Sequence, residues 1–112
     1  MDSILTSIKK LLGIDEDDTS FDTDVTIHIN SALMVLTQLG VGPPEGFAIE
    51  DKDDLWSNFI PLDYKHFESV KTYVYLKVKL VFDPPPSSAV IEVFNNTIKE
   101  LEVRLNIAAE SK

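Results

Sequence analysis

The sequence predicts an all-α protein, a small bundle of about four helices that forms a single domain over residues 1–112. Apolar residues recur at helical spacing in four stretches, and breaks rich in proline, glycine or acids separate these stretches. An apolar content of 44% is enough for one modest core. We expect a long central loop or small β-hairpin between the second and third helices. The predicted helices span residues 3–12, 22–39, 64–82 and 88–108.

The first predicted helix carries one apolar stripe and ends at Gly13, a residue suited to a helix C-terminus. We expect the stripe to pack on its own bundle, with a neighbouring subunit or partner as the alternative. The stripe consists of Ile4, Leu5, Ile8, Leu11 and Leu12.

Six acids lie within residues 15–24 and invite comparison with a calcium-binding loop. The spacing does not fit an EF-hand: if Asp15 takes the first position, there is no central glycine and Thr26 stands where a glutamate is needed. We therefore expect a solvated loop whose last acids lie at the positive end of the next helix.

The second predicted helix, residues 22–39, ends at Gly40 and Gly42. His28 lies in it without a ligand partner at metal-binding spacing, so we expect neither a metal site nor catalysis there. The expected inward face comprises Val25, Ile29, Leu33, Leu36 and Leu39, widened by Ile27, Met34 and Val35.

Residues 40–62 change character, because prolines, glycines and acids interrupt the helical pattern. The pattern indicates an extended excursion with a possible small hairpin around Asp51–Asp53. Long loops in small domains are often functional, so this segment is the expected partner-facing element. Trp56 could equally cap the core. The residues expected to contact a neighbouring subunit or a stopper protein are Phe47, Ile49, Asp51, Asp53, Trp56 and Phe59.

Within the third predicted helix, residues 70–82 alternate like a strand, but this run is about twice the usual strand length, which favours a helix. Pro84–Pro86 must end it, and Ser87 and Ser88 can cap the helix that follows. The apolar face of that last helix comprises Val90, Phe94, Ile98, Leu101 and Leu105.

The net charge of −9 makes the chain a poor candidate for gripping nucleic acid, since that affinity depends on cations at phosphates. We find no nucleophile with a base, no phosphate-binding glycine loop and no cysteine. An enzyme and a cofactor are therefore not expected. The N-terminal region lacks a secretion-signal pattern, and no apolar run is long enough to span a membrane, so we expect a soluble cytoplasmic protein.

Several segments together resemble the head–tail connector (adaptor) proteins of tailed bacteriophages, over about residues 3–109. These segments are the acidic turn 15–22, the helix end Leu36–Gly42, Gly46–Ile49 with Trp56, Val70–Leu80, Phe82–Pro85 and Leu101–Asn106. The resemblance implies an all-α subunit in a ring, commonly of twelve copies, beneath the portal. Such a ring extends the DNA channel toward a stopper or tail-completion protein, in the neck of the virion after assembly in the host cytoplasm.

If the resemblance holds, the C-terminal stretch is expected to dock on the portal, and deleting residues 106–112 should abolish portal binding in a folded monomer. Double-stranded DNA would pass through the lumen without specific binding. The alternative is a small acidic cytoplasmic helical protein-interaction module, a regulator or DNA mimic. Ring formation or co-assembly with a portal separates the two. The expected portal-docking residues are Leu105, Asn106, Ile107, Ala108 and Ala109.

Overall fold

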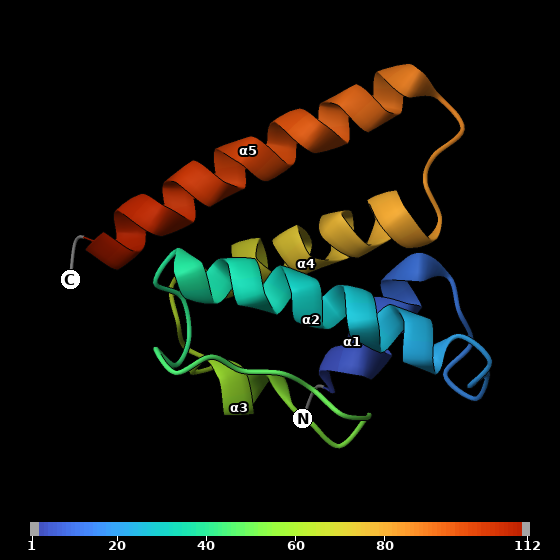
Figure 1. The fold of residues 1–112 in the computed structure, drawn as a ribbon, viewed down its shortest axis with the longest axis horizontal. Helices are drawn as coiled ribbons and strands as arrows, with labels where there is room; N and C mark the ends of the chain where they lie inside the picture. Colours follow the sequence, from blue (N-terminus) through green and yellow to red (C-terminus); the bar gives the residue numbers. More distant parts are fainter. Residues whose placement is uncertain (1–2, 111–112) are drawn as a thin grey trace.

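The computed structural model describes residues 3–110 and confirms the all-α prediction (Figure 1). The four expected helices are present, together with one additional short helix in the central excursion. The helices are α1 (Ile4–Leu12), α2 (Asp22–Gln38), α3 (Trp56–Phe59), α4 (Phe67–Phe82) and α5 (Ser88–Glu110).

The local signals at the helix ends act as the sequence predicts. The hydroxyl of Ser3 accepts a hydrogen bond from the backbone N–H of Thr6 and begins α1, and Gly13 ends it with φ at +81°. The Ser87 hydroxyl accepts from the N–H of Val90 at 3.4 Å and begins α5. Helix α4 starts three residues later than expected, because residues 61–67 form successive tight turns instead.

Of the two forms expected for the central excursion, the structure shows the long loop and not the small hairpin around Asp51–Asp53. The carboxylate of Asp54 accepts hydrogen bonds from the N–H groups of Glu50 and Asp51, and these bonds fold the segment into a turn. Within residues 3–110 the only β-type pairing is an isolated antiparallel bridge between Ser3 and Leu55. The excursion thus joins the start of α1 rather than pairing with itself.

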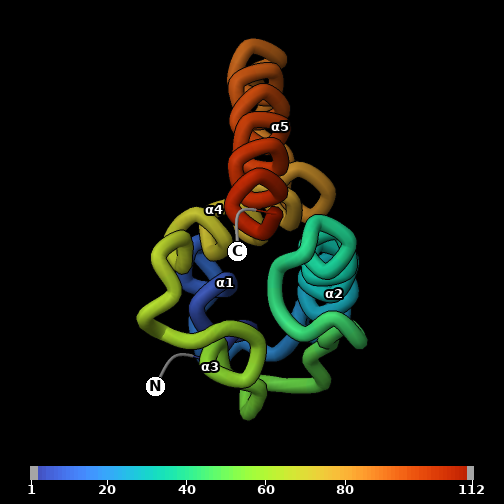
Figure 2. Tube along the Cα trace, turned by 90° about the vertical axis from the view of Figure 1, so that its left-hand side faces the viewer, coloured from blue at the N-terminus to red at the C-terminus, as the bar shows by residue number. Residues whose placement is uncertain are grey.

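Helices α1, α2 and α4 surround the core, α5 packs mainly on α4, and α3 lies on the side opposite α5 (Figure 2). The first stripe packs on its own bundle, as expected: Ile4, Leu5 and Ile8 are buried, although Leu11 is exposed. The largest fully buried side chains are Trp56, Tyr73, Ile4, Ile8, Ile29, Leu33, Leu36, Leu105, Val25, Val70, Val74 and Val78.

Two residues of α2 that we expected to face inward lie on its outer side. Ile27 and Met34 are 56% and 59% exposed, because at 100° per residue they lie almost opposite Val25, Ile29 and Ala32. Val90 is also exposed, in the first turn of α5. No helix in the described range is both long and apolar enough to cross a membrane.

Candidate docking surfaces

Trp56 and Phe59 anchor the central excursion inside the monomer. The Trp56 side chain is fully buried, its Nε1–H donates to the Ser7 hydroxyl at 2.8 Å, and its ring meets Phe67 edge-on. The Phe59 ring packs so closely on Gly42 that any Cβ there would collide with it, and Gly42 also has φ at +83°. Of the two sequence interpretations of Trp56, the structure favours the core cap.

Ile49 is buried as well, and a side chain of α2 holds its backbone. The Asn30 amide accepts from the Ile49 N–H at 2.7 Å and donates to the Ile49 carbonyl at 3.0 Å. Of the residues predicted to contact a neighbour, Asp51 and Asp53 are exposed and Phe47 is half-buried. Contact with a neighbouring subunit or stopper protein stays a prediction for all six residues.

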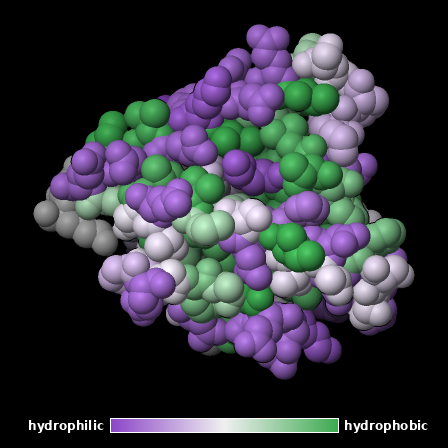
Figure 3. Space-filling model, in the orientation of Figure 1, coloured by the Kyte–Doolittle hydropathy of each residue, from purple (hydrophilic) through white to green (hydrophobic). Residues whose placement is uncertain are grey.

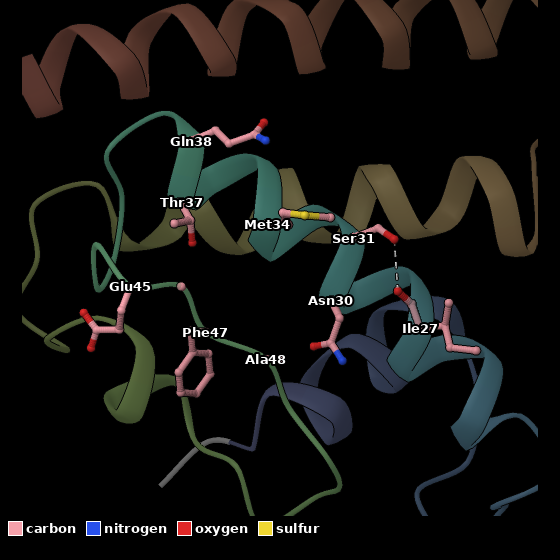
Figure 4. Close-up of a pocket in the computed structure, with 10 residues that line it drawn as sticks. Ile27, Asn30, Ser31, Met34, Thr37, Gln38, Glu45, Phe47 and Ala48 are labelled. Atoms are coloured by element: carbon pink, nitrogen blue, oxygen red, sulfur yellow. Dashed lines mark hydrogen bonds between the residues drawn. The ribbon is translucent and has the colours of Figure 1, made fainter.

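An open groove of about 720 Å³ runs between the outer side of α2 and residues 45–48 of the excursion (Figure 4). The exposed side chains of Ile27 and Met34 and the half-buried ring of Phe47 give it an apolar lining, and Glu45 carries a charge at its edge. Figure 3 shows apolar patches among hydrophilic side chains on this face of the molecule. We call this feature the α2 groove. Sequence reasoning missed it, because it placed Ile27 and Met34 in the core.

The two acidic loops, far apart in the sequence, meet beside the α2 groove. Asp22 from the start of α2 and Glu50 and Asp51 from the excursion line one hollow, and Ile27 lines both that hollow and the groove. A second hollow brings Glu16 and Asp17 next to Lys52 of the excursion and to the Lys9–Asp22 pair described next. No group of acids or histidines within residues 3–110 is arranged to hold a metal ion.

The buried side chain of Lys9 holds the first acidic loop in place. Its side chain is 4% exposed, and its Nζ donates to the carbonyls of Glu16 at 3.2 Å and Asp18 at 2.7 Å. The same Nζ forms an ion pair with Asp22 Oδ1 at 2.7 Å. The two groups are not aligned for a hydrogen bond, so this contact is electrostatic only. Hydrogen bonds from the hydroxyl and N–H of Ser20 lower the pKa of Asp18. This loop is therefore ordered around a buried cation, which the sequence pattern did not indicate.

The predicted portal-docking residues divide between the inside and the outside of the molecule. Leu105 is buried, the Asn106 amide donates to the Leu39 carbonyl at 3.3 Å, and a Cβ at Gly40 would lie only 2.9 Å from that of Ala109. Ile107 is 56% exposed, and with Ala108 it lines a hollow of about 550 Å³. That hollow also contains Lys65, His66 and Arg104. Residues 111–112 of the predicted docking stretch lie outside the described range.

Tyr73 joins α4 to α5 through a partly buried polar contact. Its ring is fully buried and its hydroxyl donates to Glu102 Oε2 at 2.7 Å. Burial raises the pKa of Tyr73, and the neighbouring Glu102 carboxylate raises it further. This bond fixes the register of α5, so that Ile98 and Leu105 face α4 while Val93 and Val103 face outward.

Charge is distributed unevenly along the chain. Residues 1–63 contain thirteen acids and three bases, whereas residues 64–112 contain six acids and seven bases. The acidic half includes the α2 groove and both acidic loops, and the nearly neutral half is the α4–α5 hairpin with the hollow near Arg104. The molecule thus has one acidic side and one side that carries most of its cations.

Comparison with known proteins identifies the family. A family model described as phage connector protein matches residues 4–112, which is nearly the whole chain. No curated protein and no solved structure matches it. The match agrees with the resemblance based on the acidic turn, Val70–Leu80 and Leu101–Asn106, and the family has a structural rather than an enzymatic role. The chain therefore belongs to the phage connector protein family.

Proposed function

We propose that this protein is an adaptor subunit that forms a ring below the portal of a tailed phage, extends the DNA channel and joins the capsid to the tail. The family match over residues 4–112 is the observation that carries the proposal. The expected partners are further copies of the chain, commonly twelve in all, the portal protein, and a stopper or tail-completion protein. The protein works in the neck of the virion.

The acidic side suits a channel through which DNA must slide. The loops containing Asp17 and Asp51 lie close together and bring their charges to one side of the subunit. Repeated around a ring, such a surface repels phosphates, because its acids greatly outnumber Lys52, the cation between the two loops. Double-stranded DNA would then pass without specific binding.

The outward side of the last turns of α5 is the proposed contact with the portal. Ile107 and Ala108 line a hollow beside the cations Lys65 and Arg104, so an apolar residue with a nearby acid on the portal would fit it. Leu105, Asn106 and Ala109 hold the helix end against the body of the subunit. Deleting residues 106–112 would therefore also remove contacts within the monomer.

A point substitution separates docking from folding. We expect Ile107→Glu to weaken binding to the portal encoded by the same phage by at least about tenfold, because the new carboxylate would repel the acid expected on the portal and compete with it for Lys65 and Arg104. Leu62→Glu, at another exposed apolar position, is the matched control and should bind like the wild type. Co-elution and titration with purified portal measure both, and circular dichroism checks the fold. Unchanged binding by Ile107→Glu would refute this docking site, and a wild-type chain that never binds the portal would refute the proposed function.

A further inference from the structure

We propose that the α2 groove receives the outer face of α5 from a second copy of the chain. The outer face of α5 means Val93 and Val103 with the flanking cations Lys99 and Arg104. Because this contact would repeat between neighbours in the ring, it deepens the proposed function and rests on it. Four observations support it: two exposed apolar surfaces, their matching lengths, the different charge of the two surfaces and the fixed register of α5.

Both surfaces expose large apolar side chains to solvent. Ile27 and Met34 in the groove are 56% and 59% exposed, and Val93 and Val103 on α5 are 60% and 59% exposed. Apolar surface that gathers in a groove or along one helix face commonly marks an interaction site. A helix that lies in an apolar groove is a recurrent mode of recognition.

The two surfaces have matching lengths. Ile27 and Gln38 mark the ends of the groove along α2, and at 1.5 Å per residue they are about 16 Å apart. Val93 and Val103 are about 15 Å apart along α5 by the same measure. One helical segment can therefore cover the whole groove.

The charges around the two surfaces differ. Glu45 lies at the edge of the groove, and Glu50 and Asp51 line the hollow that adjoins it at Ile27. The outer face of α5 carries the exposed bases Lys99 and Arg104 together with the exposed acids Glu92 and Glu100, and Arg104 pairs with Glu100. Acids that face acids would repel each other, so two grooves are not suited to meet. A groove that meets α5 instead gains Lys99 as a partner for its acids.

A contact between two different surfaces generates a chain of subunits. Each copy offers one groove and one α5 face, so the contact is heterologous and closes into a ring when the rotation permits. The inner side of α5 is already used within the monomer, through Ile98, Leu105 and the Tyr73–Glu102 bond. The outer face therefore stays available for a neighbour, and the same contact adds each further copy.

Cross-linking tests the contact directly, because the chain has no cysteine of its own. Met34→Cys and Val103→Cys place thiols at exposed positions in the groove and on α5. With a short bismaleimide, the double variant should give a ladder of cross-linked multimers, in solution at high concentration and on the portal. Each single variant should stay uncross-linked, and an equimolar mixture of the two should give dimers only. A Leu62→Cys/Val103→Cys variant is the matched control and should give no ladder.

The outcomes separate this inference from the proposed function. A double variant that joins the portal but gives no ladder overturns the inference and leaves the function standing. A ladder without any portal binding supports the inference and overturns the function, and the absence of both overturns both. Cross-linking of the Met34→Cys variant to itself would show a groove-to-groove contact and would also overturn the inference.

Discussion

The two segments that carry the acidic loops, residues 13–21 and 40–66, are held to the bundle in different ways. A buried cation holds the first, since Lys9 binds two of its carbonyls and pairs with Asp22. Apolar anchors and an amide hold the second, through Trp56, Phe59 and the Asn30 side chain. An acid-rich loop can therefore be well ordered, and its order depends on the buried side chains that contact it.

The largest expected effect comes from removing the apolar anchor of the second segment. Trp56→Ala should destabilise the protein by about 3–5 kcal/mol, because it empties a fully buried site and leaves the Ser7 hydroxyl without its donor. Urea unfolding followed by circular dichroism measures the change. A loss below about 1 kcal/mol would mean that the excursion is not anchored as described.

Removing the cation beneath the first segment should have the next largest effect. Lys9→Met should cost about 3 kcal/mol, because it leaves the Asp22 carboxylate and two carbonyls without their partner. This loss of stability lies at the low end of what breaking a buried ion pair costs, since the Asp22 side chain is 31% exposed. Lys10→Met is the matched control at an exposed position and should change stability by less than about 0.5 kcal/mol. Equal losses in both variants would contradict the buried-cation account.

The amide contact between α2 and the excursion should matter less. Asn30→Leu removes two hydrogen bonds to the Ile49 backbone and should cost about 2 kcal/mol. Hydrogen exchange should show faster exchange at Ile49 and its neighbours, with little change in residues 13–21. If exchange in residues 13–21 accelerates equally, the two segments do not behave independently.

The smallest effect at neutral pH, but the clearest pH dependence, belongs to the bond between α4 and α5. Tyr73→Phe should cost about 1 kcal/mol near pH 7. The folded state raises the pKa of Tyr73 above its ordinary value of 10.0, so its contribution is complete below pH 10 and is lost as the pH rises further. Above pH 10 the variant should therefore lose stability less steeply than the wild type.

Tyr75→Phe is the matched control for this pH dependence, since the Tyr75 hydroxyl makes no hydrogen bond within the described part of the chain. Its unfolding free energy should follow the wild-type curve between pH 9 and pH 11. Parallel curves for all three proteins would contradict the role assigned to Tyr73.

The helical spacing of apolar residues and the positions of helix-breaking residues predicted most of the fold. Glycine and proline marked the ends of α1, α2 and α4, and helical spacing identified Ile29, Leu33 and Leu105 as core residues. The outward position of Ile27 and Met34 was not predicted, because a helix with apolar residues on both sides gives no signal for which side is covered. The hairpin prediction failed because turn residues alone do not distinguish a strand pair from a turn closed by the Asp54 carboxylate.

The docking surfaces were harder to predict than the fold. Trp56, Phe59 and Ile49 resembled a partner-facing cluster in the sequence, but the structure buries them, because the excursion folds back onto α1 and α2. Lys9 holds the first acidic loop by binding backbone carbonyls seven and nine residues away. A pattern of side chains cannot predict such a contact, because every residue has a backbone carbonyl. The division of residues 105–109 into inner and outer members likewise depends on where Leu39 and Gly40 end α2.

Cryo-electron microscopy of the protein mixed with the portal from the same phage, and of each alone, tests the central claim most directly. We expect a closed ring of copies capping the tail-facing end of the portal, with α5 of each copy near the α2 groove of its neighbour. A well-folded protein that never joins the portal would contradict the adaptor function and would favour a small acidic interaction module instead.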